Sequence, residues 1–150
     1  MAAGCAALAL LSRPFWHDLT VEVTWARVLG LVVLVTSTAF AVWARVSLAN
    51  MWSFDAEVKV DHQLRTSGPY AVTRHPIYTG LLGMLIGTTL LSGVGKWIVL
   101  VLAGLVLFEV KSRSEEKILV ESFPSHYPGY RERVPRLLPG LSLLPWHARP

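Results

Sequence analysis

Long apolar runs separated by short polar segments are the main pattern in this sequence. Positions 26–44 are apolar apart from Arg27 and three small hydroxyl residues. About nineteen helical residues match the ~30 Å hydrocarbon core of a bilayer. Positions 77–108 are also apolar, but they are too long for one span and are interrupted by the turn-forming segment 92–96. The pattern therefore predicts one spanning helix followed by a helical hairpin, which makes three transmembrane helices.

The regions on either side of this core divide the expected domain. Positions 2–11 are apolar, but they lack a basic n-region and are too short to span a bilayer alone. They are read as a half-helix or part of a further span, with a signal peptide as a less favoured alternative. We expect a single all-α membrane domain over 1–150. It comprises an N-terminal apolar segment and loop at 1–24, a transmembrane core at 25–110, and a cytosolic helix and lid-like tail at 111–150.

Composition supports lipid, and not water, as the main solvent. The 150 residues are 53% hydrophobic and 16% charged, whereas soluble domains carry roughly 25% charged residues. The net charge is +4, but the basic residues lie in loops beside apolar runs and do not form one stripe, so we expect no nucleic-acid partner. Cys5 is the single cysteine, which excludes an internal disulfide framework and a cysteine-rich zinc site. No metal is expected.

The distribution of Lys and Arg predicts the orientation in the membrane. Eleven of the fourteen lie in segments 45–76 and 109–150, which share one side if the span and the hairpin are each threaded once. Because cytoplasmic loops carry the excess of Lys and Arg, that side should be cytoplasmic. Most polar residues that could perform chemistry fall on the same face.

One polar cluster surrounds the start of the predicted hairpin. Pro76 suits the first position of a helix, where its missing N–H would be unpaired in any case. The free amides beyond it attract anions, so Arg74 and His75 beside them predict a site for a carboxylate or phosphate. The alternative is that Arg74 is an interfacial anchor, His75 a helix cap and Tyr78 part of an aromatic belt.

A second cluster follows the hairpin and contains Lys111, Arg113, Glu115 and Glu116. Helical spacing allows Lys111 to pair with Glu115 and Arg113 with Glu116, each pair worth ~0.2–0.5 kcal/mol on an ordinary surface. The hairpin, however, returns this helix beside Pro76, and opposed charges across one cleft suit a zwitterionic cofactor. Glu115 and Glu116 point about 100° apart on a helix, so we expect only one to face that cleft.

Four sequence blocks carry a family resemblance. They are His62-x-Leu64-x-Thr66-Ser67-Gly68-Pro69-Tyr70, Arg74-His75-Pro76-x-Tyr78-x-Gly80, Arg113-x-Glu115-Glu116-x-x-Leu119 and Phe123-x-x-x-Tyr127-x-x-Tyr130-x-x-x-Val134-Pro135. Their order and spacing resemble the isoprenylcysteine carboxyl methyltransferase family over roughly 25–140. A weaker resemblance extends to phospholipid N-methyltransferases. One departure is Pro124, where the family usually has glycine after the phenylalanine.

This resemblance implies a multispan helical enzyme that uses S-adenosylmethionine, yields S-adenosylhomocysteine and has no Rossmann domain. The implied cofactor pocket opens to the cytosol, and a lipophilic substrate enters from the bilayer. Residues carried over to the cofactor pocket are His62, Leu64, Tyr70, His75, Pro76, Ile77, Tyr78 and Glu115. Arg113 or Lys111 would orient an acceptor carboxylate, whereas Glu116 would be the base for an amine or thiol acceptor.

The expected function is methyl transfer from S-adenosylmethionine to a lipophilic acceptor, either an isoprenylcysteine-like carboxylate or another small lipophilic carboxylate. The alternatives are a phospholipid or amine N-methyltransferase and a non-enzymatic membrane scaffold that retains the fold. Expected partners are the lipophilic substrate and membrane lipids. The sequence does not decide the oligomeric state.

Overall fold

The computed structural model describes residues 23–48 and 64–138, and this part of the chain is helical. The long helices are α3 (Thr24–Leu48), α4 (Pro76–Leu91) and α5 (Ile98–Ser122). Shorter elements are the 3-10 turns η2 (Gly68–Ala71) and η3 (Gly95–Trp97) and the helix α6 (Tyr127–Arg133). The predicted N-terminal apolar segment and His62 lie outside the described residues.

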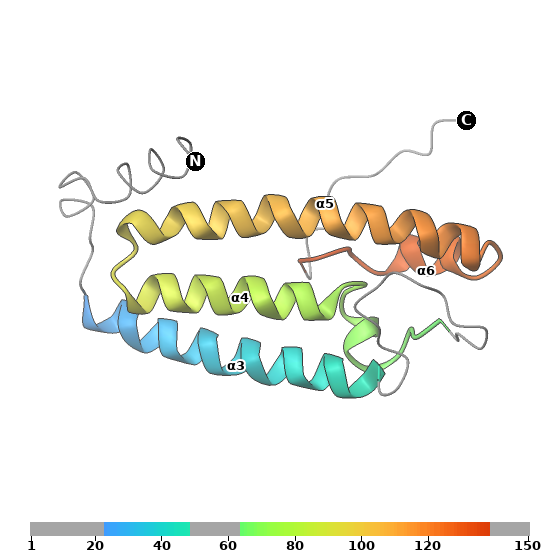
Figure 1. The fold of residues 1–150 in the computed structure, drawn as a ribbon. Helices are drawn as coiled ribbons and strands as arrows, with labels where there is room; N and C mark the ends of the chain where they lie inside the picture. The colour runs from blue at the N-terminus through green and yellow to red at the C-terminus, as the bar shows by residue number, and fades with distance from the viewer. Residues whose placement is uncertain (1–22, 49–63, 139–150) are drawn as a thin grey trace, which may run out of the picture.

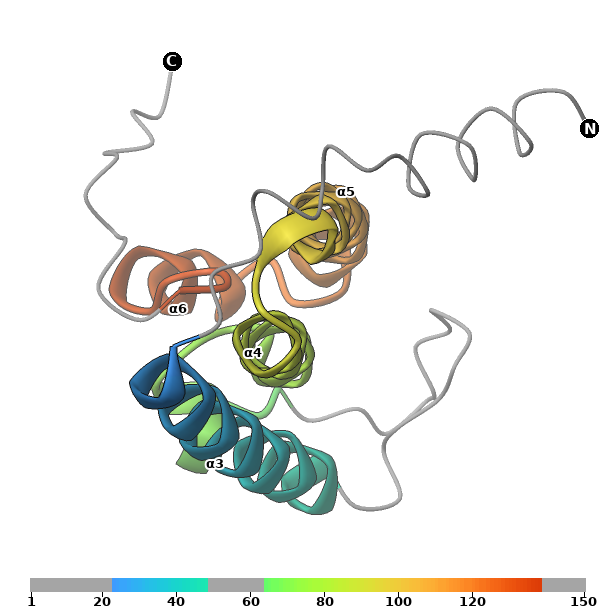
Figure 2. The same ribbon diagram turned by 90° about the vertical axis from the view of Figure 1, so that its left-hand side faces the viewer.

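The three long helices lie side by side with α4 between α3 and α5 (Figures 1 and 2). Helix α3 is 25 residues long, and among the described helices it alone is long and apolar enough throughout to cross a membrane. Helix α4 is a shorter apolar helix, and α5 is apolar as far as Phe108 before it becomes charged. The described part is therefore all-α, as predicted, while the three-span arrangement stays a prediction.

Glycines bring α3 and α4 into close contact. A Cβ atom built on Gly87 would lie 2.7 Å from the backbone nitrogen of Leu34, and one on Gly30 would lie 2.9 Å from the carbonyl oxygen of Gly87. Farther along the same seam, a Cβ on Gly80 would lie 2.7 Å from that of Ala41. Small residues at such positions let two helix backbones approach closely, which is how helices associate inside lipid. The close packing of α3 against α4 therefore depends on glycine at these positions, where any side chain would meet the neighbouring helix.

The turn between α4 and α5 falls in the segment that the sequence predicted. Gly93, Val94 and Gly95 all have positive φ, at 87°, 58° and 36°. The amide of Val94 donates to the carbonyl of Thr89 at 2.8 Å, which closes the turn. A left-handed conformation is unusual for a β-branched residue such as Val94, so the surrounding structure must hold it. The predicted helical hairpin is confirmed in this part of the chain.

The chain after α6 returns to the start of α4. The amide of Arg74 donates to the carbonyl of Pro135 at 2.9 Å, and that of His75 donates to the carbonyl of Arg136 at 3.1 Å. The hydroxyl of Thr73 also donates to the Arg136 carbonyl, at 2.7 Å. His75 is the N-cap of α4, and the tail supplies the acceptor that its amide lacks within the helix. The tail segment 134–138 is thus fastened beside the first turn of α4.

Candidate functional site

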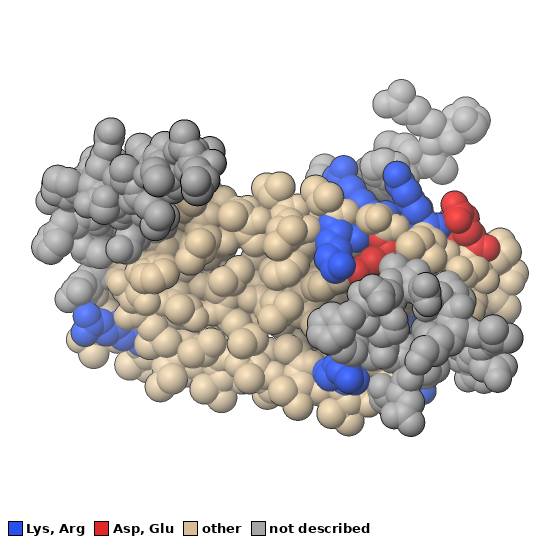
Figure 3. All heavy atoms as spheres, viewed as in Figure 1, with Lys and Arg blue, Asp and Glu red and all other residues tan. Residues whose placement is uncertain are grey.

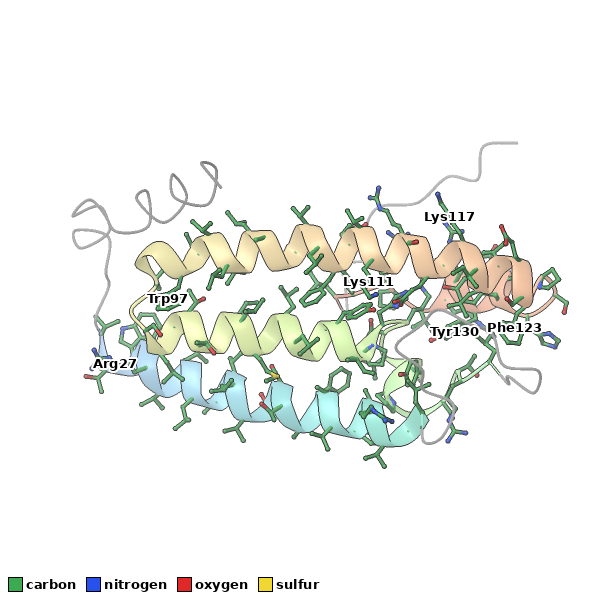
Figure 4. All side chains as sticks on the ribbon, in the orientation of Figure 1. Arg27, Trp97, Lys111, Lys117, Phe123 and Tyr130 are labelled. Carbon is green, nitrogen blue, oxygen red and sulfur yellow. The ribbon has the colours of Figure 1, made fainter. Side chains whose placement is uncertain are left out.

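Charged side chains gather at one end of the helical bundle, and an apolar body separates them from the other end (Figure 3). Figure 4 shows Lys111, Lys117 and Tyr130 at this end and Arg27 and Trp97 at the opposite one. The charged end is built from the start of α4, the second half of α5, α6 and the tail segment 134–138. Segments distant in sequence therefore meet beside Pro76, as the hairpin predicted.

His75 is the central residue of this end. It is the residue immediately before α4, where Pro76 supplies the first helical position. Its side chain makes no capping hydrogen bond, and only 7% of the residue is exposed. Its Nδ1 lies 3.4 Å from Oε2 of Glu115, and its Nε2 lies 3.4 Å from Oε1 of Glu116. The imidazole therefore lies between two carboxylates of α5.

Both neighbouring glutamates face the same histidine, so the expectation that only one would face the cleft is wrong. The two side chains leave α5 about 100° apart, but the imidazole presents a nitrogen on each of two edges and meets both. Glu116 is the more buried, with 4% of the residue exposed, whereas the Glu115 side chain is 30% exposed. They differ in environment and not in whether they face His75.

Glu116 is surrounded by cationic groups from three directions. Arg136 approaches through Nε and Nη2, each 3.1 Å from one carboxylate oxygen, and Arg74 Nη2 lies 3.1 Å from Oε1. The Nε of Arg131, from α6, lies 4.0 Å away. Burial alone would raise the pKa of Glu116, but the nearby imidazole of His75, the hydrogen bonds from Arg136 and the charge of Arg74 lower it to about 2. Glu116 is therefore ionised at neutral pH.

Glu115 has fewer and weaker partners. The hydroxyl of Tyr78 donates to its Oε1 at 2.5 Å, and Nζ of Lys111 lies 3.8 Å from the same oxygen. Burial acts to raise the pKa of Glu115, and the hydrogen bonds from His75 and Tyr78 outweigh burial and lower it. This carboxylate is ionised, partly accessible and not enclosed by arginine. It is the better placed of the two to receive a ligand.

An aromatic column leads from the carboxylates toward the apolar part of the bundle. The ring of Tyr78 stacks on His75, with centroids 5.7 Å apart, and on Phe108 of α5, with centroids 5.3 Å apart. Burial lowers the pKa of His75, but Glu115 and Glu116 outweigh burial and raise it. The column thus joins an imidazole that favours its charged form to the apolar part of α5 at Phe108.

Three buried polar atoms in the described residues have no hydrogen-bond partner. They are Nε of Arg74, Nε2 of His75 and the hydroxyl of Tyr127. The nearby hydroxyl of Tyr130 is bonded, since it donates to the carbonyl of Tyr70 at 2.6 Å. Buried polar atoms without a partner are uncommon and cost free energy. Two donors and a hydroxyl are therefore available at the charged end.

The structure unites most of the residues singled out in the sequence. His75 contacts Glu115 and Glu116, and Glu115 also contacts Tyr78 and Lys111. Pro76 and Tyr70 are buried beside them, while Ile77 and Leu64 are half-buried. His62 lies outside the described residues, and the role assigned to each residue stays a prediction.

Arg113 is the predicted residue that lies away from the cluster. Its side chain is 62% exposed, and its Nε lies 2.8 Å from Oε1 of Glu109. It therefore pairs with the residue four positions before it and not with Glu116, because Arg74 and Arg136 surround that carboxylate. Lys111 pairs with Glu115, as its spacing predicted.

Arg136 is the functional candidate that the sequence analysis did not single out. It contacts Glu116 and also Glu109, whose Oε1 lies 2.6 Å from its Nη1. The only sequence signal is its place directly after Val134-Pro135, within a block that already carried the family resemblance. Nothing local distinguishes it from the other basic residues of the tail.

Comparison with known proteins relates the sequence and fold of this chain to methyltransferases. Residues 25–126 match the model of a family described as phospholipid methyltransferase. The chain is 31% identical over 132 residues to protein-S-isoprenylcysteine O-methyltransferase of Mus musculus, which covers 86% of this chain and 46% of the mouse protein. It is 38% identical over 82 residues to methanethiol S-methyltransferase of Pseudomonas deceptionensis, covering 55% of this chain and 30% of that protein.

The fold matches a solved structure of a eukaryotic intramembrane Ras methyltransferase, isoprenylcysteine carboxyl methyltransferase. The TM-score is 0.72 at 27% identity, over 79% of this chain and 43% of that chain. The chain belongs to the phospholipid methyltransferase family, and within it resembles the isoprenylcysteine methyltransferases, which confirms the resemblance seen in the sequence. The chain spans less than half the length of these relatives.

Proposed function

We propose that this chain is a membrane methyltransferase that uses S-adenosylmethionine and transfers its methyl group to a lipophilic acceptor. The observation that carries the proposal is the contact between His75, Tyr78 and Glu115 at the charged end of an apolar bundle. This cluster lies within the region that matches the methyltransferase family. The proposed cofactor pocket is the one carried over by motif, from His62 and Leu64 through Tyr70 and His75–Tyr78 to Glu115.

The chemistry of the cluster fits S-adenosylmethionine, which would supply a methyl group whose carbon is activated by the sulfonium sulfur it is bonded to. Glu115 is a partly exposed carboxylate suited to an ammonium group or ribose hydroxyls, in bonds strengthened by charge. Arg74 has a buried Nε without a hydrogen-bond partner and is suited to a carboxylate. The Tyr78 ring is stacked between His75 and Phe108, and its hydroxyl lies beside the Glu115 carboxylate. Anionic, cationic and aromatic groups for a zwitterionic sulfonium cofactor are thus present together.

The task of the protein residues is to align the two reactants and exclude water. Glu116 has a pKa of about 2, so it is a weak base at neutral pH. This favours an acceptor that needs no proton removed, such as a carboxylate, which Lys111 or Arg113 would orient. A thiol or amine acceptor is the second candidate, favoured by the methanethiol S-methyltransferase relative and by the family description. Glu116 would then be the base.

We further propose that the chain spans the membrane three times and that the charged end faces the cytoplasm. The support is the position of eleven of the fourteen Lys and Arg residues in segments 45–76 and 109–150. Apolar side chains exposed along α3 and the first half of α5 then face lipid. The acceptor reaches the charged end from the bilayer.

The direct test is calorimetry of the full chain in detergent, with S-adenosylmethionine and S-adenosylhomocysteine titrated separately. We expect both to bind, because they share the amino acid, ribose and adenine groups. Folding is checked in the same sample by circular dichroism. A folded protein that binds neither compound would contradict the proposal and favour the non-enzymatic scaffold. The topology is tested separately by labelling the cysteine variants Thr66→Cys and Ser125→Cys in sealed vesicles. We expect both positions to be labelled from the same side, and labelling from opposite sides would contradict the topology.

A further inference from the structure

Arg136 contacts the cluster in two ways that involve different parts of the residue. Its guanidinium meets both oxygens of Glu116 at 3.1 Å, and its Nη1 also reaches Glu109 at 2.6 Å. Its carbonyl oxygen accepts from the His75 amide at 3.1 Å and from the Thr73 hydroxyl at 2.7 Å. One tail residue is therefore bound both to α5 and to the backbone that leads into α4.

The contact with Glu116 limits what that carboxylate offers to His75. A two-point arginine–carboxylate pair fixes the plane of the carboxylate as well as its position. Although Oε1 of Glu116 lies 3.4 Å from Nε2 of His75, that nitrogen makes no hydrogen bond. The distance is beyond the usual range for an N–H···O bond. Arg136 and Arg74 therefore hold the Glu116 carboxylate just out of bonding position.

We propose that Arg136 is a positioning residue that gives the two neighbouring glutamates different tasks. By holding Glu116 through both oxygens it makes this carboxylate a fixed counter-charge, and it leaves Glu115 as the carboxylate that exchanges partners with a ligand. The difference in exposure agrees with this division, since the Glu116 side chain is 5% exposed and that of Glu115 is 30% exposed. The consequence for cofactor binding rests on the proposed function. The positioning of Glu116 by Arg136 does not depend on that function.

The titration of His75 reports this arrangement without any ligand. Its charged neighbours are Glu115 and Glu116 from α5, Arg74 beside it in the chain, and the guanidinium of Arg136 behind Glu116; Tyr78 stacks on it from α4. Loss of Arg136 removes a positive charge and frees Glu116 to accept a hydrogen bond from Nε2. Both effects favour the imidazolium. The pKa of His75 should therefore rise further when Arg136 is replaced.

The experiment uses the full chain in detergent with ¹⁵N-labelled histidine, the His75 signal being assigned by its loss in His75→Gln. We expect Arg136→Gln to raise the His75 titration midpoint by about one pH unit, the size of effect expected when a carboxylate gains contact with an imidazole. Arg136→Lys keeps one charge but not the two-point contact and should give a smaller rise. Arg133→Gln is the matched control, because Arg133 is exposed, is the last residue of α6 three positions before Arg136, and bonds to the Gly129 carbonyl.

Two results would overturn the proposal. An unchanged midpoint in both Arg136 variants would mean that Glu116 holds its position without Arg136. A midpoint that falls toward about 6.5 would mean that Arg136 only docks the tail and that its loss exposes His75 to water. Arg136→Lys keeps the test available if Arg136→Gln does not fold.

Cofactor binding provides a second, separate measurement. Arg136→Gln should weaken S-adenosylhomocysteine binding by about tenfold, the loss expected when one hydrogen bond to a charged group is misaligned. Unweakened binding in Arg136→Gln, beside a wild-type chain that binds, would contradict the proposed role in ligand binding. A wild-type chain that binds no S-adenosylhomocysteine would instead contradict the proposed function, and the His75 titration would still decide the role of Arg136.

Discussion

The seam between α3 and α4 and the charged end of the molecule are held together by opposite means. Along the seam, glycines leave room for backbone atoms to approach, and shape alone sets the fit. At the charged end, Glu116 and its arginine and histidine neighbours come from α5, the loop before α4, α6 and the tail, and charge pairing sets the fit. Substitutions that add side-chain volume should therefore destabilise the seam, whereas substitutions that remove a charge should destabilise the charged end.

The largest expected effect is at Glu116. Glu116→Gln removes a buried negative charge that both Arg74 and Arg136 contact, and only Arg136 keeps a second carboxylate partner, Glu109, among the contacts described. Breaking a buried ion pair from one side costs about 3–5 kcal/mol in the free energy of unfolding. Thermal unfolding in detergent measures the loss, and Glu121→Gln on the exposed surface of the same helix is the control. Equal melting temperatures for the two variants would contradict this account of the charged end.

Acid tests the same carboxylate without a mutation. The pKa of Glu116 is lowered from 4.5 to about 2, so its stabilising contribution is complete above about 4.5 and is lost as pH falls toward 2. We expect the melting temperature of the wild-type protein to fall steeply across this range. The fall should be smaller in Glu116→Gln, if that variant folds. Parallel curves for the two proteins would show that another acid governs the transition.

The seam should respond to volume. A Cβ on Gly87 would lie 2.7 Å from the Leu34 nitrogen and 2.8 Å from the Gly30 carbonyl oxygen, and neither backbone can move aside freely. Gly87→Ala should therefore lower the free energy of unfolding by about 1–3 kcal/mol. The control is Gly129→Ala in α6, where nothing lies within 4 Å of the new Cβ. Matching unfolding curves for the two variants would show that the seam is not close-packed.

The smallest effect is expected on the outer face of α3. Thr36 is exposed, and within the described part of the chain its hydroxyl bonds only to carbonyls of its own helix, at 2.8 Å to Val32 and 3.2 Å to Val33. Thr36→Val keeps the shape and removes no contact with α4, so unfolding should change by less than about 0.5 kcal/mol. The same thermal unfolding experiment measures it. A loss of unfolding free energy as large as that of Gly87→Ala would contradict the exposed position of Thr36 on α3.

Local sequence signals predicted much of this fold. Pro76 begins α4, the segment 92–96 contains the turn, and α5 continues past Glu115 and Glu116 to Ser122, all as expected. Each of these features depends on near neighbours in the chain, such as a proline at a first helical position or glycines in a turn. Helical spacing likewise predicted the pairing of Lys111 with Glu115.

The remaining features depend on distant contacts. Both glutamates face His75 because the imidazole presents two nitrogens, which their 100° separation on α5 did not reveal. Arg136 joins α5 only because the tail returns to the start of α4, and no local pattern specifies that return. The α3–α4 seam also needs two helices in register before its glycines have a role.

Calorimetry with S-adenosylhomocysteine on two glutamate variants of α5 tests the central claim most directly. Glu115→Gln removes the partly exposed carboxylate beside His75 and Tyr78, while Glu121→Gln changes an exposed acid farther along the same helix. We predict that Glu115→Gln weakens binding by at least about tenfold, as expected for the loss of a hydrogen bond to a charged group, and that Glu121→Gln binds like the wild type. Equal affinities in the two variants, with the wild type binding, would contradict the assignment of Glu115 to the cofactor pocket.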